Sequence, residues 1–472
     1  MECATGVITV GVTDTVTRPV LEIRDPADDS VVGSVPVGGT AEVDAAVRAA
    51  RSAAGAWART APAERGARLA AAAARVEAAA DELALLTTRE MGKPLGDARG
   101  GVDAGVGTLR QYAELGPVHR GRSLQGGWDA TDLMVPVPRG VVAAITPWND
   151  PVAVACGLLG AALVTGNTVV SKPSERTPHT GLALVRLLVE AGLPVEVVPG
   201  DGGTGAALAA HPDVDVIAHV GSTSAGRSIA RAAAETGAKV LRENGGCDAL
   251  VVDAGVDPAW AAGQAALGCF ANAGQICTSV ERVYVHADVA VAFLAELVTR
   301  ARALVQGPGA APDTQLAPLV DRRARSAVHA QVAAAVDAGA RLHCGGAVPD
   351  GPGAFYPATV LTDCTDDMAV MREETFGPVA SVRVVGSFDE GLAAAARSEY
   401  GLAAVVLTRD MEHAQRAWRE LPVGTVKVNA VFGGAPGGAA QPRRGSGDGF
   451  GYGPELLDEL TVTKVVHLGV AP

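Results

Sequence analysis

Residues 270–278 read Phe-Ala-Asn-Ala-Gly-Gln-Ile-Cys-Thr and place one thiol, that of Cys277, just after a Gly-Gln turn. The small residues before the thiol allow the backbone to come close to a bound molecule. A cysteine attacks a substrate as its thiolate, so a nucleophilic role requires a dipole, a cation or a base nearby. The alternative is an unreactive cysteine in the core, where most free cysteines lie.

Three further motifs flank this stretch. Leu-Arg-Glu-Asn-Gly-Gly occupies residues 241–246, Pro-Trp-Asn residues 147–149, and Glu-Glu-Thr-Phe-Gly-Pro residues 373–378. In order and spacing, the four motifs closely resemble those of the aldehyde dehydrogenase superfamily, and they extend over much of the 472 residues. The chain is therefore identified as a member of that family.

Composition limits the classes of partner. A net charge of −13 argues against nucleic acid and anionic membranes, which attract basic patches. The longest uncharged apolar run, residues 151–164, is shorter than the ~18 residues of a membrane span, and the first residues form no basic signal-peptide region. Seven cysteines without Cys-x-x-Cys spacing indicate reduced thiols, with neither a disulfide framework nor a metal site. We expect a cytoplasmic enzyme.

The first third of the chain has two kinds of pattern. Residues 20–23 and 31–35 have strand composition on either side of a turn and predict a hairpin. Helical spacing predicts one helix over 40–57 and a second over 61–91. Periodicity stops near residue 117, and residues 117–137 are predicted to form a loop and an edge strand.

Strands and helices alternate from residue 141 onward. Strands are predicted over 141–145, 168–171, 195–198 and 216–220, with helices over 152–164 and 181–190 between them. This order predicts a parallel sheet with ligand loops at the carboxyl ends of its strands. Strands over 249–252 and 283–285, a helix over 322–340 and a strand after it predict a second α/β region; residues 433–451 are predicted to be a loop.

Two glycine-rich turns are candidates for binding phosphate. Residues 200–205 fit Gly-x-Gly-x-x-Gly, but this signal is weak in a chain with 58 glycines and fits a plain turn equally well. Residues 221–226, Gly-Ser-Thr-Ser-Ala-Gly, are the better candidate, because they resemble the family's loop whose helix N-terminus faces the dinucleotide diphosphate. The alternative for this second turn is a Ser-capped helix start.

The resemblance implies a reaction with a role for each motif. Cys277 attacks the aldehyde, and the amide of Asn149, with the Cys277 backbone N–H, stabilises the oxyanion. Hydride then passes to a nicotinamide, and Glu243 activates the water that hydrolyses the thioester. From the residues alone, Asn149 fits a turn and Glu243 a solvated charge.

The resemblance also implies cofactor contacts. Glu374 and Phe376 contact the nicotinamide ribose and ring, and Lys172 and Glu175 contact the adenosine ribose. The other residues assigned to cofactor binding are Thr146, Trp148, Ser174, Gly205, Gly221 and Ser222. Because a carboxylate at Glu175 repels a 2′-phosphate, NAD is expected over NADP, although Lys172 softens the repulsion. An ion pair between Lys172 and Glu175 is the alternative.

The fold implied by the resemblance is α/β. It has two parallel-sheet domains, a Rossmann-like NAD-binding domain of residues 1–116 and 138–246 and a catalytic domain of residues 247–454. A small β oligomerisation arm comprises residues 117–137 and 455–472, with 461–468 as a partner strand, and implies a homodimer or homotetramer.

The chain departs from the family pattern at Cys247, Asp150 and Phe450-Gly451. Asp150 and Gly157 stand where the family often has aromatic rings, so we expect a roomier and more polar substrate pocket. The alternative is that Asp150 caps a helix beginning at Pro151.

Two other functions fit parts of this pattern. An acylating dehydrogenase would pass the thioester to coenzyme A, but such enzymes do not require the base at Glu243. A catalytically silent dinucleotide-binding protein is disfavoured by the joint presence of Cys277, Glu243 and Asn149.

Overall fold

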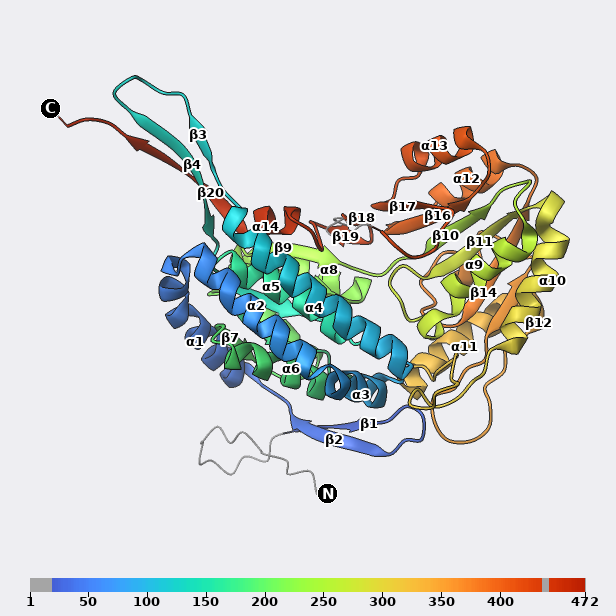
Figure 1. Cartoon of the computed structure of the whole chain (residues 1–472). Coiled ribbons are helices and arrows are strands. Elements are labelled where there is room, and N and C mark those ends of the chain that lie inside the picture. The colour runs from blue at the N-terminus through green and yellow to red at the C-terminus, as the bar shows by residue number, and fades with distance from the viewer. Residues whose placement is uncertain (1–18, 435–440, 472) are drawn as a thin grey trace.

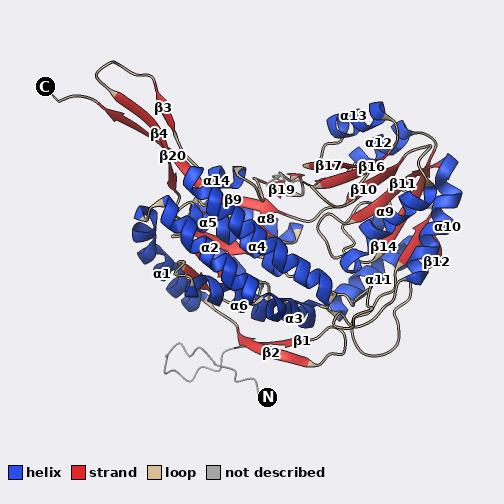
Figure 2. Cartoon of the chain, in the orientation of Figure 1, coloured by secondary structure: helices blue, strands red, loops and turns tan. Residues whose placement is uncertain are grey.

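Uninterrupted runs of β-branched and other apolar residues form the strands of two large parallel sheets in the computed structural model, which describes residues 19–434 and 441–471 (Figures 1 and 2). Residues 1–18, which include Cys3, and residue 472 lie outside the described residues, at the ends of the predicted domains. Residues 435–440 of the predicted loop also lie outside them. The predicted α/β class is confirmed.

The first sheet has the strand order β19-β9-β8-β5-β6-β7. Its strands are β5 (Val141–Ile145), β6 (Thr168–Lys172), β7 (Val195–Val197), β8 (Val216–Val220), β9 (Lys239–Glu243) and β19 (Gly447–Asp448). All neighbours are parallel except β19, which runs antiparallel to β9. Strands β5, β6 and β8 are buried throughout, as expected for a parallel sheet covered on both faces. The chain order reverses between β5 and β8, which places a ligand crevice at their carboxyl ends.

Helices cover both faces of this sheet. One face packs against α1 (Thr40–Arg59), α7 (Gly202–Ala209) and α8 (Thr223–Thr236). The other packs against α2 (Pro62–Ala78), α3 (Ala80–Met91), α4 (Leu95–Val118), α5 (Pro151–Val164), α6 (Pro178–Glu190) and the short α14 (Glu455–Glu459).

The single helix predicted over 61–91 is wrong, because the chain forms α2 and α3 with a break at Ala79. The Ala79 N–H donates to the carbonyls of Arg75 and Val76, so the last turn of α2 tightens and ends there. Alanine carries no local signal for a break. The break allows α2 and α3 to pack separately against α4 and α6.

The second sheet has the order β12-β13-β14-β11-β10-β16-β17 and is parallel except between β12 and β13. Its strands are β10 (Asp248–Val252), β11 (Val280–His286), β12 (Arg341–Cys344), β13 (Thr359–Thr362), β14 (Val379–Val385), β16 (Ala403–Leu407) and β17 (Thr425–Val428). Its helices are α9 (Pro258–Phe270), α10 (Ala287–Ala303), α11 (Arg322–Asp337), α12 (Phe388–Ala396) and α13 (Met411–Glu420), with short 3₁₀ turns η1 (Ala271–Gly274) and η2 (Ala369–Met371). Strands β15 (Tyr400–Gly401) and β18 (Arg443–Arg444) form a separate pair.

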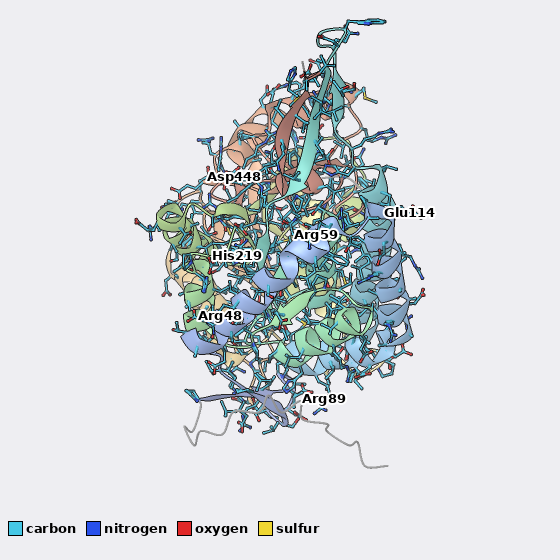
Figure 3. All side chains as sticks on the ribbon, turned by 90° about the vertical axis from the view of Figure 1, so that its left-hand side faces the viewer. Arg48, Arg59, Arg89, Glu114, His219 and Asp448 are labelled. Carbon is cyan, nitrogen blue, oxygen red and sulfur yellow. The ribbon has the colours of Figure 1, made fainter. Side chains whose placement is uncertain are left out.

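Two small sheets complete the molecule. The predicted hairpin is present as β1 (Val20–Arg24) and β2 (Val31–Pro36). Strands β3 (Arg122–Leu124), β4 (Thr131–Pro138) and β20 (Thr461–Leu468) form a three-stranded arm that projects from the body (Figures 1 and 3). The predicted pairing of 461–468 with the strand before residue 138 is therefore present, whereas the role of the arm in assembly stays a prediction. No helix in the described ranges is long and apolar enough to cross a membrane.

The close packing of α4 on α5 generates a stability prediction. A Cβ atom at Gly116 would lie 2.0 Å from Cγ2 of Val164 and 3.1 Å from its Cβ, so rotation of the valine cannot relieve the clash. We expect Gly116→Ala to lower the free energy of unfolding in urea by about 1–3 kcal/mol through overpacking.

Gly107→Ala is the matched control, because Gly107 lies in the same helix with open space around it. That variant should gain up to about 1 kcal/mol from helix propensity alone. Equal stabilisation by both substitutions would contradict the packing argument.

Candidate active site

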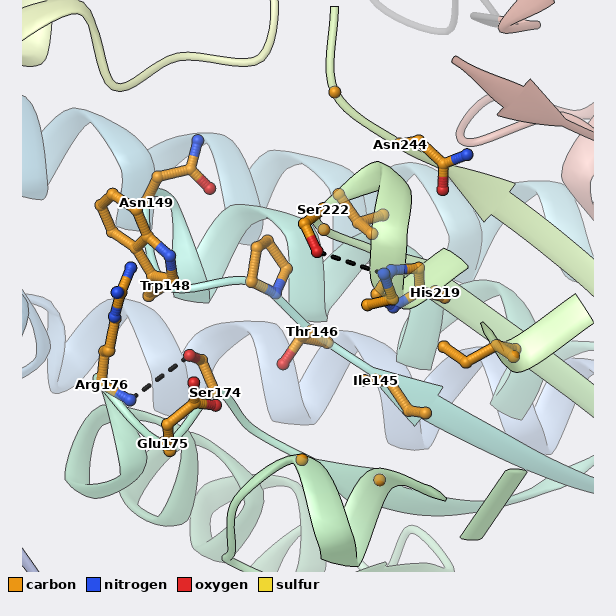
Figure 4. A pocket seen from close by; sticks show the side chains of 18 of the residues that line it. Ile145, Thr146, Trp148, Asn149, Ser174, Glu175, Arg176, His219, Ser222 and Asn244 are labelled. Carbon is orange, nitrogen blue, oxygen red and sulfur yellow. Dashed lines mark hydrogen bonds between the residues drawn. The ribbon is translucent and has the colours of Figure 1, made fainter. Parts of the chain in front are cut away.

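A cavity of about 660 Å³ lies where the carboxyl edge of the first sheet faces the amino edge of the second. All the predicted site residues line it: Asn149, Glu243, Cys277, Thr146, Trp148, Lys172, Ser174, Glu175, Gly205, Gly221, Ser222, Glu374 and Phe376. Figure 4 shows part of this wall. A volume of this size is typical of small-molecule sites, and no cluster suited to a metal ion occurs in the described ranges.

The loop before Cys277 has an unusual backbone. Asn272 (φ 48°), Ala273 (φ 54°) and Gly274 (φ 74°) are consecutive left-handed residues. At Gly274 only glycine fits, because a Cβ atom would lie 2.0 Å from the carbonyl oxygen of Gly377. The buried Gln275 side chain holds the turn by donating to the Asn272 carbonyl (3.1 Å) and accepting from the Val320 N–H (2.8 Å).

Glu243 ends β9, and its carboxyl lies beside the thiol of Cys277 on the loop before β11, close enough for each group to shift the pKa of the other. Burial raises the pKa of the Glu243 carboxyl, and burial together with the nearby Glu243 raises the pKa of Cys277 well above its usual value. The Cys277 thiol is therefore protonated at rest. The Glu243 carboxyl, whose pKa is raised, lies beside it as a proton acceptor. The base that a nucleophilic role requires is present.

Asn149 approaches the same loop from the first sheet. It follows β5, and its Nδ2 donates to the backbone carbonyl of Gln275 at 3.1 Å. One hydrogen of the amide remains free for a further acceptor. The arrangement brings Asn149, Glu243 and Cys277 together from three segments of the chain.

Asp150 occupies the cap position of α5, with Pro151 at the first helical residue, but its side chain makes no capping hydrogen bond. Its carboxylate instead lies 3.4 Å from Nζ of Lys93, a side chain that is 9% exposed. The predicted capping contact is therefore absent. The ion pair puts two charged groups beside Asn149, whose carbonyl also accepts from Lys93 at 3.4 Å.

Gly157 does not enlarge the cavity. A Cβ atom there would lie 2.4 Å from Cε1 of Tyr452, so this ring fills the space in front of the glycine. Tyr452 is close enough to Glu243 and Asp150 for their charges to raise its pKa further above the value set by burial. The expectation of extra room at Gly157 does not agree with this geometry, and the expectation of a more polar substrate pocket stays a prediction.

Lys172 and Glu175 lie at the other end of the cavity. Their charged groups are 3.6 Å apart, so the predicted alternative of an ion pair is present. Burial lowers the pKa of Lys172, and Glu175 partly opposes this effect. The sequence reading missed Arg176, whose guanidinium lies 5.2 Å from the ring centre of Trp148 (Figure 4) and 2.9 Å from Asp321.

The two glycine-rich turns differ in structure. In the first, the Asp201 carboxylate caps α7 by accepting from the N–H groups of Gly203 (2.8 Å) and Thr204 (3.4 Å). A carboxylate at this helix end disfavours a bound phosphate. In the second, Ser222 caps α8 by accepting from the Ala225 N–H (3.3 Å) while also lining the cavity.

The segment of Glu374 and Phe376 is held by a residue that the sequence reading missed. Both oxygens of the buried Glu281 accept from this segment, from the Thr375 N–H (3.2 Å) and the Phe376 N–H (3.1 Å). Phe376 has a φ of 51°, and its ring meets Trp148 edge-on at 5.5 Å. The sequence signal was a carboxylate near the start of the strand that follows Cys277.

Glu281 and Glu374 are neighbouring buried acids. Burial and the charge of Glu374 raise the pKa of Glu281 to about 8. Burial raises the pKa of Glu374 to about 7, although its Oε1 accepts from the Gly246 N–H at 3.1 Å. The floor of the cavity therefore carries less negative charge at neutral pH than its composition indicates.

Known proteins resemble this chain in sequence and in fold. The model for the aldehyde dehydrogenase family matches residues 13–466. Identity is 37% to betaine aldehyde dehydrogenase of Cereibacter sphaeroides, over 92% of this chain and 90% of that protein. It is 38% to 3,6-anhydro-alpha-L-galactose dehydrogenase of Streptomyces coelicolor, over 95% and 93%. The crystal structure of PnpE from Pseudomonas sp. WBC-3 superposes with a TM-score of 0.93 at 32% identity, covering 96% of each chain. PnpE in complex with nicotinamide adenine dinucleotide gives the same score at 33% identity, covering 96% and 95%.

Proposed function

This chain belongs to the aldehyde dehydrogenase family, and from that premise we propose that it oxidises an aldehyde to the carboxylic acid with NAD. The observation that carries the proposal is the position of Glu243 beside Cys277 inside a cavity lined by every predicted cofactor residue. A nucleophile in contact with a base is the minimum requirement for covalent catalysis.

The residues of the cavity fit a dinucleotide. The N-terminus of α8 offers N–H groups to a diphosphate, and Ala206, Ala225 and Ile229 of α7 and α8 form an apolar wall for a base. Lys172 and Glu175 lie beside this wall, while Glu374 and Phe376 lie near Cys277. A bound nicotinamide would supply the hydride acceptor.

In the proposed mechanism the Cys277 thiol gives its proton to Glu243 and attacks the carbonyl carbon. The free hydrogen of the Asn149 amide and the Cys277 backbone N–H donate to the oxyanion, each worth on the order of 3 kcal/mol in such sites. Once the tetrahedral carbon formed by this attack has lost its hydride, a thioester joins the substrate to Cys277. Glu243 releases its proton and then takes one from the water that hydrolyses this thioester.

The alternative acceptor is coenzyme A. The contact between Glu243 and Cys277 favours water, because a base beside the thioester serves hydrolysis. Assays with and without coenzyme A distinguish the two reactions.

We further propose that the substrate is a polar aldehyde. The charged pair Lys93–Asp150 lies beside Asn149, and the ring of Tyr452 lies in front of Gly157, close enough to Glu243 and Asp150 for their charges to affect it. Burying these groups against an apolar chain would remove their hydration without replacing it. The named relatives act on betaine aldehyde and an anhydrogalactose, and both of these substrates are polar.

Assembly, domain roles and location complete the proposal. The first-sheet region binds NAD, the second carries the nucleophile, and the arm joins copies of the chain into a homodimer or homotetramer. Exposed Val462, Val465 and Leu468 on β20 support the last point, since association would bury them. The pairing of β19 with β9 returns residues 447–448 to the first sheet, within the segment assigned to the catalytic domain. A cytoplasmic location stays a prediction.

Two substitutions separate the steps of the reaction. Cys277→Ser should reduce aldehyde oxidation by on the order of 10³-fold or more while NAD binding persists, because a hydroxyl is a far weaker nucleophile. Glu243→Gln should give a burst of reduced cofactor and then slow turnover, with an acyl adduct visible by mass spectrometry. Alkaline pH suits this assay, since the thiol then ionises without its base. Near-normal turnover in the serine variant, or unchanged turnover without adduct in the glutamine variant, would refute the assigned roles.

Glu175 generates a prediction of cofactor preference. We expect kcat/KM with NAD to exceed that with NADP by about tenfold or more, equivalent to ~1.4 kcal/mol, because the carboxylate repels a 2′-phosphate. Glu175→Gln should narrow this ratio, mainly by improving NADP. Equal efficiencies with both cofactors in the native enzyme would show that Glu175 does not face the ribose.

The charged pair generates a prediction of substrate preference. The native enzyme should prefer a hydroxy-aldehyde over an apolar aldehyde of similar length, and Asp150→Asn should reduce that preference several-fold, within the ~1–3 kcal/mol of one polar contact. Asp97→Asn is the control, because Asp97 is exposed on α4 outside the cavity. A preference for the apolar aldehyde, or no change in Asp150→Asn, would contradict the polar wall.

A further inference from the structure

His219 lies at the carboxyl end of β8, in the middle of the first sheet. Its register partner on β5 is Ile145, whose partner on β6 is Lys172, while on the other side His219 pairs with Arg242 of β9. Residues aligned in this way project from the same face of a parallel sheet. Ile145 packs in the core against α1, α7 and α8, so the histidine is on the face that carries the proposed cofactor site.

The imidazole of His219 is buried without a good partner. The residue is 4% exposed and lines the cavity. Figure 4 marks a contact between the ring and the backbone of Ser222, which opposes the lowering of the ring's pKa; apart from this contact, neither ring nitrogen has a hydrogen-bond partner within the described part of the chain. A buried polar group without a hydrogen-bond partner lowers the stability of the fold by about 1–3 kcal/mol. Such groups are rare, and one explanation is that a bound ligand supplies the missing partner.

The position of the ring indicates the chemistry of that ligand. A Cβ atom on Gly221 would lie 2.7 Å from Cε1 and 3.1 Å from Nε2 of His219, so the ring edge lies directly against the loop that begins α8. The N-terminus of this 14-residue helix attracts anions through its N–H groups and dipole. The His219 ring and the N-terminus of α8 therefore face one point of the cavity, and both fit a phosphate.

The charges around His219 set its resting state. Burial, together with Lys172 from β6 and Arg242 from β9, lowers the pKa of the ring to about 4, so it is neutral at pH 7. Asp201 and Glu175 act on Lys172 and offset part of its charge, while Arg227 of α8 is exposed. An anion placed beside the ring would reverse the balance and favour the imidazolium.

We propose that His219 contacts the diphosphate of the bound dinucleotide and takes up a proton from solvent as the cofactor binds. This inference rests on the proposed function, because it assumes that the cavity binds a dinucleotide. The imidazolium then donates a charge-assisted hydrogen bond to a phosphate oxygen. Because the pKa of the ring is higher in the complex than in the free protein, affinity rises as pH falls through the interval between the two values.

ADP-ribose is the probe that isolates this contact. It contains the diphosphate and both riboses but no nicotinamide, so it leaves Glu243 and Cys277 out of the measurement, and a Glu374→Gln background removes the carboxyl assigned to the nicotinamide ribose. Its affinity should rise between pH 8 and pH 5.5 by up to about tenfold per pH unit. Calorimetry in two buffers of different ionisation enthalpy should show net proton uptake. In His219→Phe, which keeps an aromatic ring, and in His219→Asn, binding should weaken and both proton uptake and pH dependence should disappear.

His211→Gln is the control, because His211 pairs with Asp44 at 3.3 Å outside the cavity and its loss should leave the profile unchanged. The inference would be overturned if both His219 variants took up as much proton as the native protein. It would also be overturned if the native protein took up none. If NAD still binds and aldehyde is still oxidised, that failure concerns His219 alone. Absence of NAD and ADP-ribose binding would overturn the proposed function as well.

Discussion

The buried amide of Gln275 joins the parts of the molecule on which the candidate chemistry depends. Its side chain binds the Asn272 carbonyl and the Val320 N–H, and its own carbonyl accepts from the amides of Asn149 and Asn272. The left-handed residues Asn272 and Ala273 each cost on the order of 1–3 kcal/mol, so the loop needs such support. Because Asn149 comes from the first sheet and Gln275 from the loop of the second, one amide sets the distance between oxyanion donor and nucleophile.

The same region concentrates carboxyl groups whose proton affinity has been raised by burial. Glu243 contacts Cys277, Glu281 holds the backbone at Phe376, and Glu374 binds the Gly246 N–H. Burial raises the pKa of all three carboxyls, because low solvent access penalises the charged form. A cavity proposed to bind an anionic cofactor therefore carries less negative charge than full ionisation of these acids would give it. The cations Lys172, Arg176 and Arg323 also line this cavity.

Much of this arrangement follows from local sequence. The strands of the first sheet are short runs of apolar residues with turns at their ends, and the rule that ligand loops follow parallel strands places Asn149 and Ser222 at one edge. What could not be predicted depends on contacts between distant residues. The break at Ala79 arises from packing on other helices, and the alanine-rich sequence contains no sign of it. The loss of space at Gly157 depends on Tyr452, which lies 295 positions later in the sequence.

Strand β4 cannot pair with β20 until the ribosome has made the end of the chain. The register joins Thr461 to Pro138, and Gly447 of β19 likewise pairs with Glu243 at the edge of the first sheet. Roughly 320 residues separate β4 from β20, and a ribosome adding ~5–20 residues per second takes on the order of 15–60 s to supply them. During that interval β4 is an incomplete sheet edge on a growing chain, open to pairing with a neighbouring nascent chain on the same messenger.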